Sequence, residues 1–124
     1  MREMERARRV PFEELPWAED APGIRAREVD VGGARWATVE YEAGAAREGW
    51  CEEGHRGFVL TGEIEYEFDD GSEPLRASEG EAFFLPPAPL GGGAHRGRNP
   101  SQRLSRLLSH RIGTAAVGGF ETLG

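Results

Sequence analysis

The sequence contains no lysine, so all 15 basic residues among its 124 are arginines. Schiff-base catalysis, a pyridoxal-phosphate site and a nucleotide-binding phosphate loop are excluded, because each depends on a lysine amine. Cysteine is almost as scarce: Cys51 stands alone, cannot form an internal disulfide and is typical of a reducing cytoplasm. Hydrophobic runs are short, and none approaches the roughly 20 residues of a membrane-spanning helix. We therefore expect a cytoplasmic protein that does not associate with membranes.

Positive charge is in deficit, with a formal net charge of −7 at pH 7. A protein that follows the phosphate backbone of a nucleic acid needs a basic surface, so we expect no nucleic-acid partner. Eighteen glycines and eight prolines interrupt every helical pattern, which argues against a helix bundle. The length fits a single domain.

The chain instead contains short segments of alternating polarity, separated by turn signals. The clearest spans residues 63–68, where Ile64, Tyr66 and Phe68 alternate with glutamates that are expected to face solvent. The segment 103–110 fits either a strand or a helix, because its leucines also have helical spacing. Further strands are expected at 24–30, 35–42, 58–60, 74–77, 81–85 and 94–99, with Phe83 and Phe84 both in a buried strand.

A series of roughly six to nine short strands in one small domain favours an all-β sandwich or barrel. The mouth of a barrel is where a small-molecule ligand would bind. We divide the chain into an N-terminal arm at residues 1–23, the β-barrel at 24–112 and a C-terminal tail at 113–124.

Few side chains can carry chemistry, since the sequence has three histidines and one cysteine. In an extended segment, Cys51, Glu53 and His55 have the same parity and would face one side. On another expected strand, His95 has the opposite parity to the neighbouring arginines, so its imidazole is expected to point inward. One thiolate and two imidazoles that meet inside a barrel would hold one divalent ion, such as zinc, iron, nickel or manganese. One or more coordination positions of the ion would stay open. Glu53 is then a candidate catalytic residue, as a general base.

These residues follow the spacing of two motifs of the cupin family, which the sequence resembles over residues 43–100. The first family motif contains His-x-His, three or four further residues, a glutamate, six residues and a glycine. Here Cys51 stands at the second histidine, His55 at the glutamate and Gly62 at the final glycine. Gly49 stands at the first histidine, so one of the usual ligands is missing.

The second family motif runs from a glycine through Pro-x-Gly to a histidine and an asparagine. In this sequence Gly80 is followed by five residues and Pro86, and His95 is followed by three residues and Asn99. The loop before His95 is four residues longer than the family pattern. The second motif thus matches at its two ends and departs in the middle.

The resemblance implies a double-stranded β-helix, the jelly-roll barrel of cupins, with a buried divalent metal and usually a homodimer. The family's ligand positions carry over onto Cys51, His55 and His95, of which only His95 keeps the family's residue type. Cupin activities range from dioxygenases to isomerases and epimerases, and some cupins bind sugars without catalysis. The fold therefore does not select a reaction.

Two functions remain open from the sequence. The first is a metal-dependent enzyme, dioxygenase- or isomerase-like, that acts on a small polar molecule, with Asn99, Tyr66 and Phe58 around the metal or in the pocket. The second is a non-catalytic module that binds or senses a small ligand, which the missing first histidine favours. Each candidate ligand also has a structural interpretation: Cys51 as a buried thiol, His55 as a hydrogen-bonded interior histidine and His95 as a residue of the rim. In either case we expect a homodimer, with aromatic residues in the core or at the interface.

Overall fold

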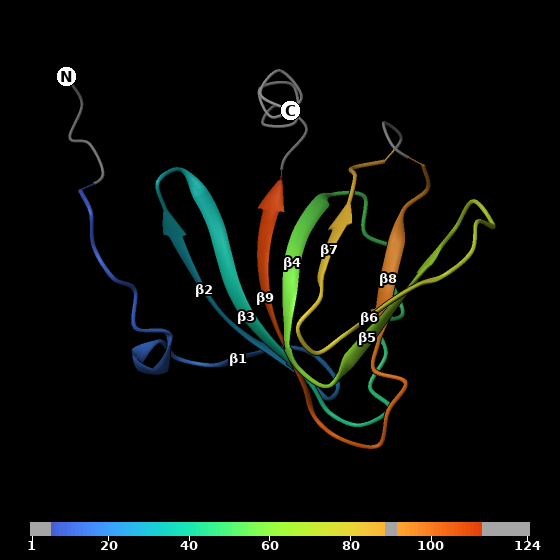
Figure 1. Cartoon of the computed structure of the whole chain (residues 1–124), viewed down its shortest axis with the longest axis horizontal. Coiled ribbons are helices and arrows are strands. Elements are labelled where there is room, and N and C mark those ends of the chain that lie inside the picture. Colours follow the sequence, from blue (N-terminus) through green and yellow to red (C-terminus); the bar gives the residue numbers. More distant parts are fainter. Residues whose placement is uncertain (1–5, 89–91, 113–124) are drawn as a thin grey trace.

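The computed structural model describes residues 6–88 and 92–112, which form β-strands and one short 3-10 helix, η1 at Phe12–Glu14 (Figure 1). In this part of the chain, no helix has the length and apolarity that crossing a membrane requires. The strands, in chain order, are β1 (Ala18–Ala21), β2 (Ile24–Val31), β3 (Ala34–Tyr41), β4 (Gly54–Thr61), β5 (Glu63–Phe68), β6 (Leu75–Ser78), β7 (Ala82–Leu85), β8 (His95–Arg98) and β9 (Ser105–Ile112).

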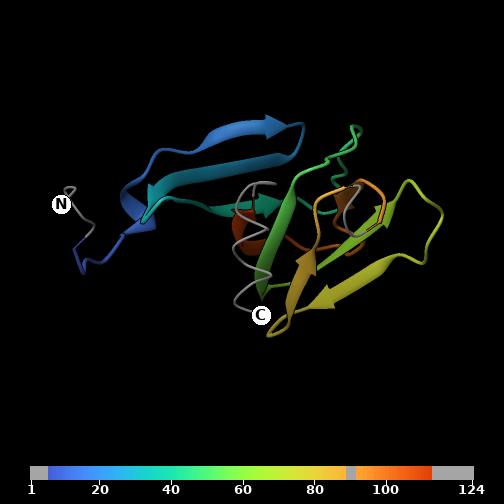
Figure 2. The same ribbon diagram turned by 90° about the horizontal axis from the view of Figure 1, so that it is seen from above.

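The strands form two antiparallel sheets of unequal size. The large sheet has the order β1-β2-β3-β9-β4-β7, and the small sheet has the order β6-β5-β8. Figure 2 shows the small sheet at one end of the large one, while β1 and β2 extend away from it. The expected all-β jelly-roll architecture is therefore confirmed.

Two glycine turns show how the sequence directs the chain. Gly32 and Gly33 join β2 to β3 at φ angles of 59° and 79°. Two consecutive positive φ angles form the tight two-residue turn that matches the twist of paired strands. Gly62, at φ 80°, separates β4 of the large sheet from β5 of the small sheet. A Cβ atom at this position would collide with Ser105, so glycine is what allows the chain to cross between the sheets.

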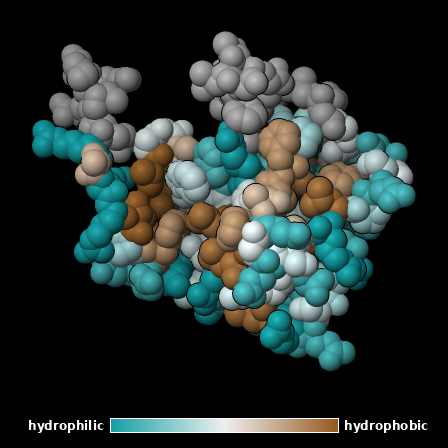
Figure 3. Space-filling view, in the orientation of Figure 1, coloured by the Kyte–Doolittle hydropathy of each residue, from teal (hydrophilic) through white to brown (hydrophobic). Residues whose placement is uncertain are grey.

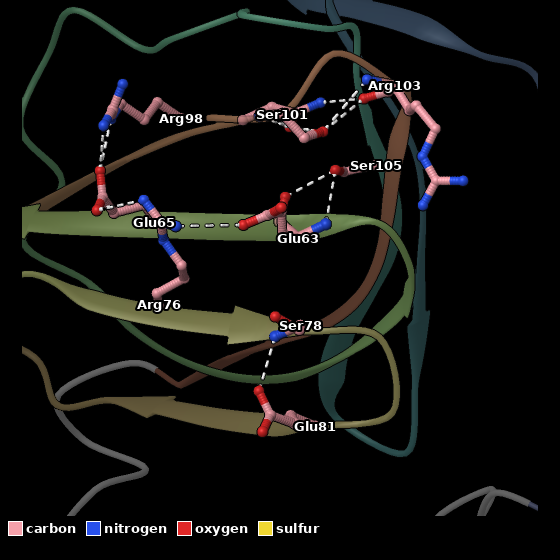
Figure 4. Close-up of polar contacts among 10 residues, drawn as sticks. Glu63, Glu65, Arg76, Ser78, Glu81, Arg98, Ser101, Arg103 and Ser105 are labelled. Atoms are coloured by element: carbon pink, nitrogen blue, oxygen red, sulfur yellow. Dashed lines mark hydrogen bonds and ion pairs between the residues drawn. The ribbon is translucent and has the colours of Figure 1, made fainter.

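The core lies between the two sheets. On β5, Ile64 and Tyr66 are buried as the alternation predicts, and Glu65 on the other side pairs with arginines of both neighbouring strands (Figure 4). Each buried aliphatic side chain contributes about 1.5–3 kcal/mol relative to an exposed one. The fully buried aliphatic residues come from both sheets and are Ile24, Val59, Ile64, Leu85 and Leu107.

Two buried polar residues fix the lower connections of the barrel. Ser105 at the start of β9 lies against Glu63 of the small sheet (Figure 4). Its Oγ accepts a hydrogen bond from the Glu63 N–H at 2.9 Å and donates one to the Glu63 carbonyl at 2.7 Å. Asn99 donates through Nδ2 to the carbonyls of Tyr41, Glu42 and Arg103 at 3.1, 3.2 and 2.7 Å. Both side chains thus satisfy backbone groups that burial would otherwise leave unpaired.

The structure refines several expectations from the sequence. The arm expected at residues 1–23 contains β1, which pairs with β2 and forms an edge of the large sheet. The ambiguous segment 103–110 is a strand, since β9 lies between β3 and β4 and pairs with both. The expectation that 81–85 is buried throughout is wrong, because Phe84 is 47% exposed whereas Phe83 is 6% exposed. The tail expected at 113–124 lies outside the described residues.

Candidate functional site

Backbone pairing brings Cys51 and His95 side by side. Cys51 precedes β4, and His95 opens β8 of the small sheet. The Cys51 N–H donates to the His95 carbonyl at 2.7 Å, and the His95 N–H donates to the Cys51 carbonyl at 2.9 Å. This isolated bridge ties the two residues together although 43 residues lie between them in the sequence. The spatial meeting of the two sequence motifs is thus built into the backbone.

His55 completes the cluster from the second position of β4. Its Nε2 lies 3.6 Å from the Cys51 Sγ, and its ring meets the His95 ring edge-on with centroids 5.2 Å apart. One ligand atom from each of the three side chains lies within 4.8 Å of the other two. On the far side of the His55 ring, Nδ1 lies 3.4 Å from the Ser109 Oγ. This contact orients the ring so that Nε2 faces the cluster.

Both imidazoles of the cluster are held neutral. Burial lowers the pKa of His55 to about 3, with further lowering by His95, Arg111 and Arg47. Burial and then the charge of Arg47 lower the pKa of His95 to about 4. A neutral imidazole has a nitrogen lone pair free to bind a metal, whereas a protonated one does not. The donor set and its protonation therefore fit a borderline divalent ion such as zinc or iron.

The cluster lies at a cavity of about 140 Å³ between the sheets. One part of the lining is apolar and comes from Ala26, Ala37, Val39 and Leu107 of the large sheet. The rest is polar or charged and consists, besides the cluster itself, of Asp20, Glu28, Arg35, Tyr41, Arg47, Tyr66, Arg96, Ser109 and Arg111, with Gly97 between them.

Within this lining, two tyrosines and one arginine are the side chains that could interact with a bound ligand. Arg47 donates through Nε to the Tyr41 hydroxyl at 2.8 Å, and its Nη2 lies 2.8 Å from a carboxylate oxygen of Asp20. The Tyr66 ring meets the His95 ring edge-on, with centroids 5.7 Å apart. Burial raises the pKa of Tyr41 and raises that of Tyr66 well above its usual value. Both hydroxyls therefore stay protonated near neutral pH and can donate hydrogen bonds.

The structure places the remaining sequence candidates differently. Tyr66 lines the cavity, as expected. Asn99 does not, because its side chain is used up in hydrogen bonds to backbone groups around the chain connection before β9. Phe58 is a correction: it is 41% exposed and lines a groove on the outer face of the large sheet, not the cavity. Glu53 is a second correction as a lining residue, since it is absent from the lining: its side chain is 54% exposed and pairs at 3.1 Å with Arg111, which does line the cavity.

Sequence reasoning missed Arg47, Tyr41 and Ser109. Ser109 has the same parity as Leu107 on β9, so strand alternation alone would have placed it inward. Tyr41 follows in the same way from the alternation of β3 with Val39. Arg47 carried no such signal, because it lies in the irregular segment between β3 and β4.

Comparison with known proteins bears on the fold. Neither protein-family models nor curated proteins give a match to the sequence. Among solved structures, a Cupin 2 conserved barrel domain protein from Salinispora arenicola CNS-205 is similar over 96% of this chain and 98% of its own, with 18% identity and a TM-score of 0.63. KdgF from a Halomonas species is similar over 80% of this chain and 86% of its own, with 24% identity and a TM-score of 0.62.

A third similar structure is described as a sugar phosphate isomerase from a cupin superfamily, from Silicibacter pomeroyi DSS-3. It covers 84% of this chain and 74% of its own, with 13% identity and a TM-score of 0.67. At identities this low, the similarity shows the fold and does not show the activity. The chain therefore has the jelly-roll fold of these cupin structures, which is the fold that the two sequence motifs predicted.

Proposed function

We propose that the protein is a metal-dependent cupin that binds and transforms a small polar molecule. Cys51, His55 and His95 hold one divalent ion, and the molecule binds beside it in the cavity. The observation that carries this proposal is the convergence of a thiol and two neutral imidazoles within 4.8 Å of one another at that cavity. Three protein ligands leave at least one position open for a substrate, which is the arrangement of catalytic rather than structural sites.

The residues around the cluster have separable roles in this proposal. Ser109 holds His55 so that Nε2 points to the ion, and the bridge to Cys51 holds His95. Tyr66 presents a protonated hydroxyl group in the cavity lining, where it can donate a hydrogen bond to a substrate oxygen. When bound, the ion would supply Lewis-acid polarisation of that oxygen. The similar structure described as a sugar phosphate isomerase supports chemistry of this class on the same fold.

A non-catalytic ligand-binding module is the second candidate, and one observation favours it. Glu53, expected as the general base, is not part of the cavity lining and is paired with Arg111. The carboxylates that do line the cavity, Asp20 and Glu28, are each paired with an arginine, at 2.8 and 3.0 Å. Among the described residues of the lining, proton transfer would thus have to use a tyrosine, a histidine or a carboxylate released from its partner.

Metal analysis of protein purified without an affinity tag tests the proposal. We expect about one equivalent of a divalent ion in the wild type, and loss of that ion in Cys51→Ala and in His95→Ala. His110→Ala is the matched control, because His110 stacks on Trp36 in the outer groove and should leave the metal content unchanged. A folded wild-type protein that binds no zinc, iron, nickel or manganese on titration would overturn the proposal. Metal binding without turnover of any bound small molecule would favour the second candidate.

A further inference from the structure

The charged part of the cavity wall is dominated by arginine. Four arginines line the cavity, Arg35, Arg47, Arg96 and Arg111, against two carboxylates, Asp20 and Glu28. Asp20 and Glu28 pair with Arg47 and Arg35, whereas Arg96 and Arg111 pair with Glu67 and Glu53 outside the lining. A divalent ion on one thiolate and two neutral imidazoles would add a net positive charge. Such a site attracts negative ligands and disfavours cations.

Arg47 is the least exposed of the arginines in the cavity wall. Its backbone N–H donates to the Gly97 carbonyl of β8 at 3.0 Å, and its side chain is only 28% exposed. Tyr41 and Asp20 fix its Nε and Nη2, so the guanidinium is positioned without a ligand. A guanidinium has five N–H donors, and these contacts engage two nitrogens, which leaves donors for a further partner.

The cavity also limits the size of the ligand. Its volume of about 140 Å³ is close to that of a cavity of about 150 Å³ known to hold benzene. A short carboxylic acid fits this space together with the ion.

From this arrangement we propose that the ligand of the cavity is a small carboxylate, and that Arg47 is the residue that binds its negative group. The inference rests on the proposed function, since it concerns the same cavity and adds the chemical class of the ligand. Planar carboxylates suit a guanidinium because two N–H groups can meet two oxygens. The incoming carboxylate replaces Asp20 as the partner of Arg47, which makes Asp20 a competitor of the ligand. The two residues should therefore affect binding in opposite directions.

Calorimetric titration with butyrate and with butyramide tests the assignment, because the two probes have nearly the same shape and differ in charge. We expect wild-type protein, with its metal content measured beforehand, to bind butyrate about tenfold more tightly than butyramide. Arg47→Gln should remove that preference, and Arg47→Lys should keep part of it. Asp20→Asn should strengthen butyrate binding several-fold. A merely structural role of Arg47 would not give opposite effects at these two positions.

The control is Arg103→Gln, since Arg103 is exposed and lies outside the cavity lining. Equal binding of the two probes, or an unchanged preference in folded Arg47→Gln, would overturn the inference. Tighter binding of inorganic phosphate than of butyrate would overturn the assignment to carboxylates. The same titrations on metal-free protein separate the two proposals. Loss of the metal site alone would leave a butyrate preference that depends on Arg47, whereas a wrong ligand class would leave metal binding intact.

Discussion

The two faces of the large sheet place the same residue types in contrasting surroundings. His55 on β4 and His110 on β9 lie on adjacent strands. His55 faces the cavity, 3.6 Å from Cys51, whereas His110 stacks on Trp36 in the outer groove with centroids 4.7 Å apart. What separates them is the side of the sheet that each strand position faces, because successive side chains alternate between faces. Residue type alone would have made His110 as good a metal ligand as His55.

Two neighbouring phenylalanines show the same difference between the inner and outer faces within one strand. Phe83 and Phe84 are neighbours on β7, and their exposed fractions are 6% and 47%. Phe84 and Phe58 belong to an outer groove of about 520 Å³ that also contains Trp36 and Leu108. Figure 3 shows hydrophobic side chains gathered over β3, β9 and β4, with hydrophilic ones around them. The inner face is thus closely packed around a small polar cavity, and the outer face is open and apolar.

The largest expected effect tests how closely the inner face is packed. A Cβ atom at Gly57 of β4 would lie 2.5 Å from the Phe83 ring and 2.5 Å from the Leu108 carbonyl oxygen. We expect Gly57→Ala to lower the free energy of unfolding by about 3 kcal/mol, because a backbone carbonyl cannot move aside. Gly49→Ala is the control, since nothing lies within 4 Å of its added Cβ. Urea denaturation measures both variants, and equal midpoints for the two would show that the inner face can yield.

The next effect is the dependence of stability on pH that the two inner histidines, His55 and His95, should cause. In metal-free protein, burial holds the pKa of His55 at about 3 and that of His95 at about 4, against 6.5 for the ordinary side chain. The unfolded chain therefore binds more protons between these values, so stability is full above about pH 6.5 and falls as the pH drops toward 4. The slope is at most about 1.4 kcal/mol per pH unit for each histidine. His55→Gln should flatten the profile of unfolding free energy against pH, and a profile that stays as steep would contradict the assigned protonation states.

Part of this organisation was predictable from the sequence. The alternation at 63–68 correctly predicts β5, and the motif spacing brought Cys51, His55 and His95 forward as a set that the structure places together. Phe58 was expected in the pocket, although its spacing of three residues from His55 places the two side chains on opposite faces. Positions three apart in one strand face opposite sides, but the strand was expected to begin at Phe58 and in fact begins at Gly54.

The other misplacements depend on tertiary contacts. Glu53 has the parity of Cys51, but a bend at that position interrupts the extended chain before β4 and turns the carboxylate toward Arg111. Arg47 is held by the Gly97 carbonyl of a strand from the other sheet, and no local pattern announces such a contact. Alternation therefore predicts a face only where the strand limits are known.

A smaller effect concerns Ser109, which contacts His55 of the candidate metal site from the inner face of the large sheet. Ser109→Ala removes the contact of 3.4 Å to His55 Nδ1 and leaves all three candidate ligands in place. We expect the affinity for zinc to fall about tenfold, which is typical for the loss of a group that orients a ligating histidine. Competition with a chromophoric chelator measures the affinity. Ser101→Ala is the matched control, because Ser101 bonds to Asn99 and Arg103 away from the cavity. An unchanged affinity in Ser109→Ala would mean that packing alone orients His55.

Substitutions in the outer groove should have the smallest effect on folding. They test instead whether two copies of the chain assemble through this groove. The homodimer expected from the sequence remains a prediction, and this groove is where two copies would meet. Its lining has Arg56 as its charged residue, whereas the chain as a whole carries a net charge of −7 and would repel a second copy elsewhere.

Replacing both Phe58 and Phe84 by serine should reduce the mass measured by light scattering from two chains to one. The stability of the folded chain should change by less than about 1 kcal/mol, because both rings are already about half exposed in the single chain. Leu104→Ser is the control, since Leu104 is 43% exposed but lies outside the groove. A wild-type mass of one chain would remove the prediction of a dimer, and a double variant that stays dimeric would move the interface to another surface.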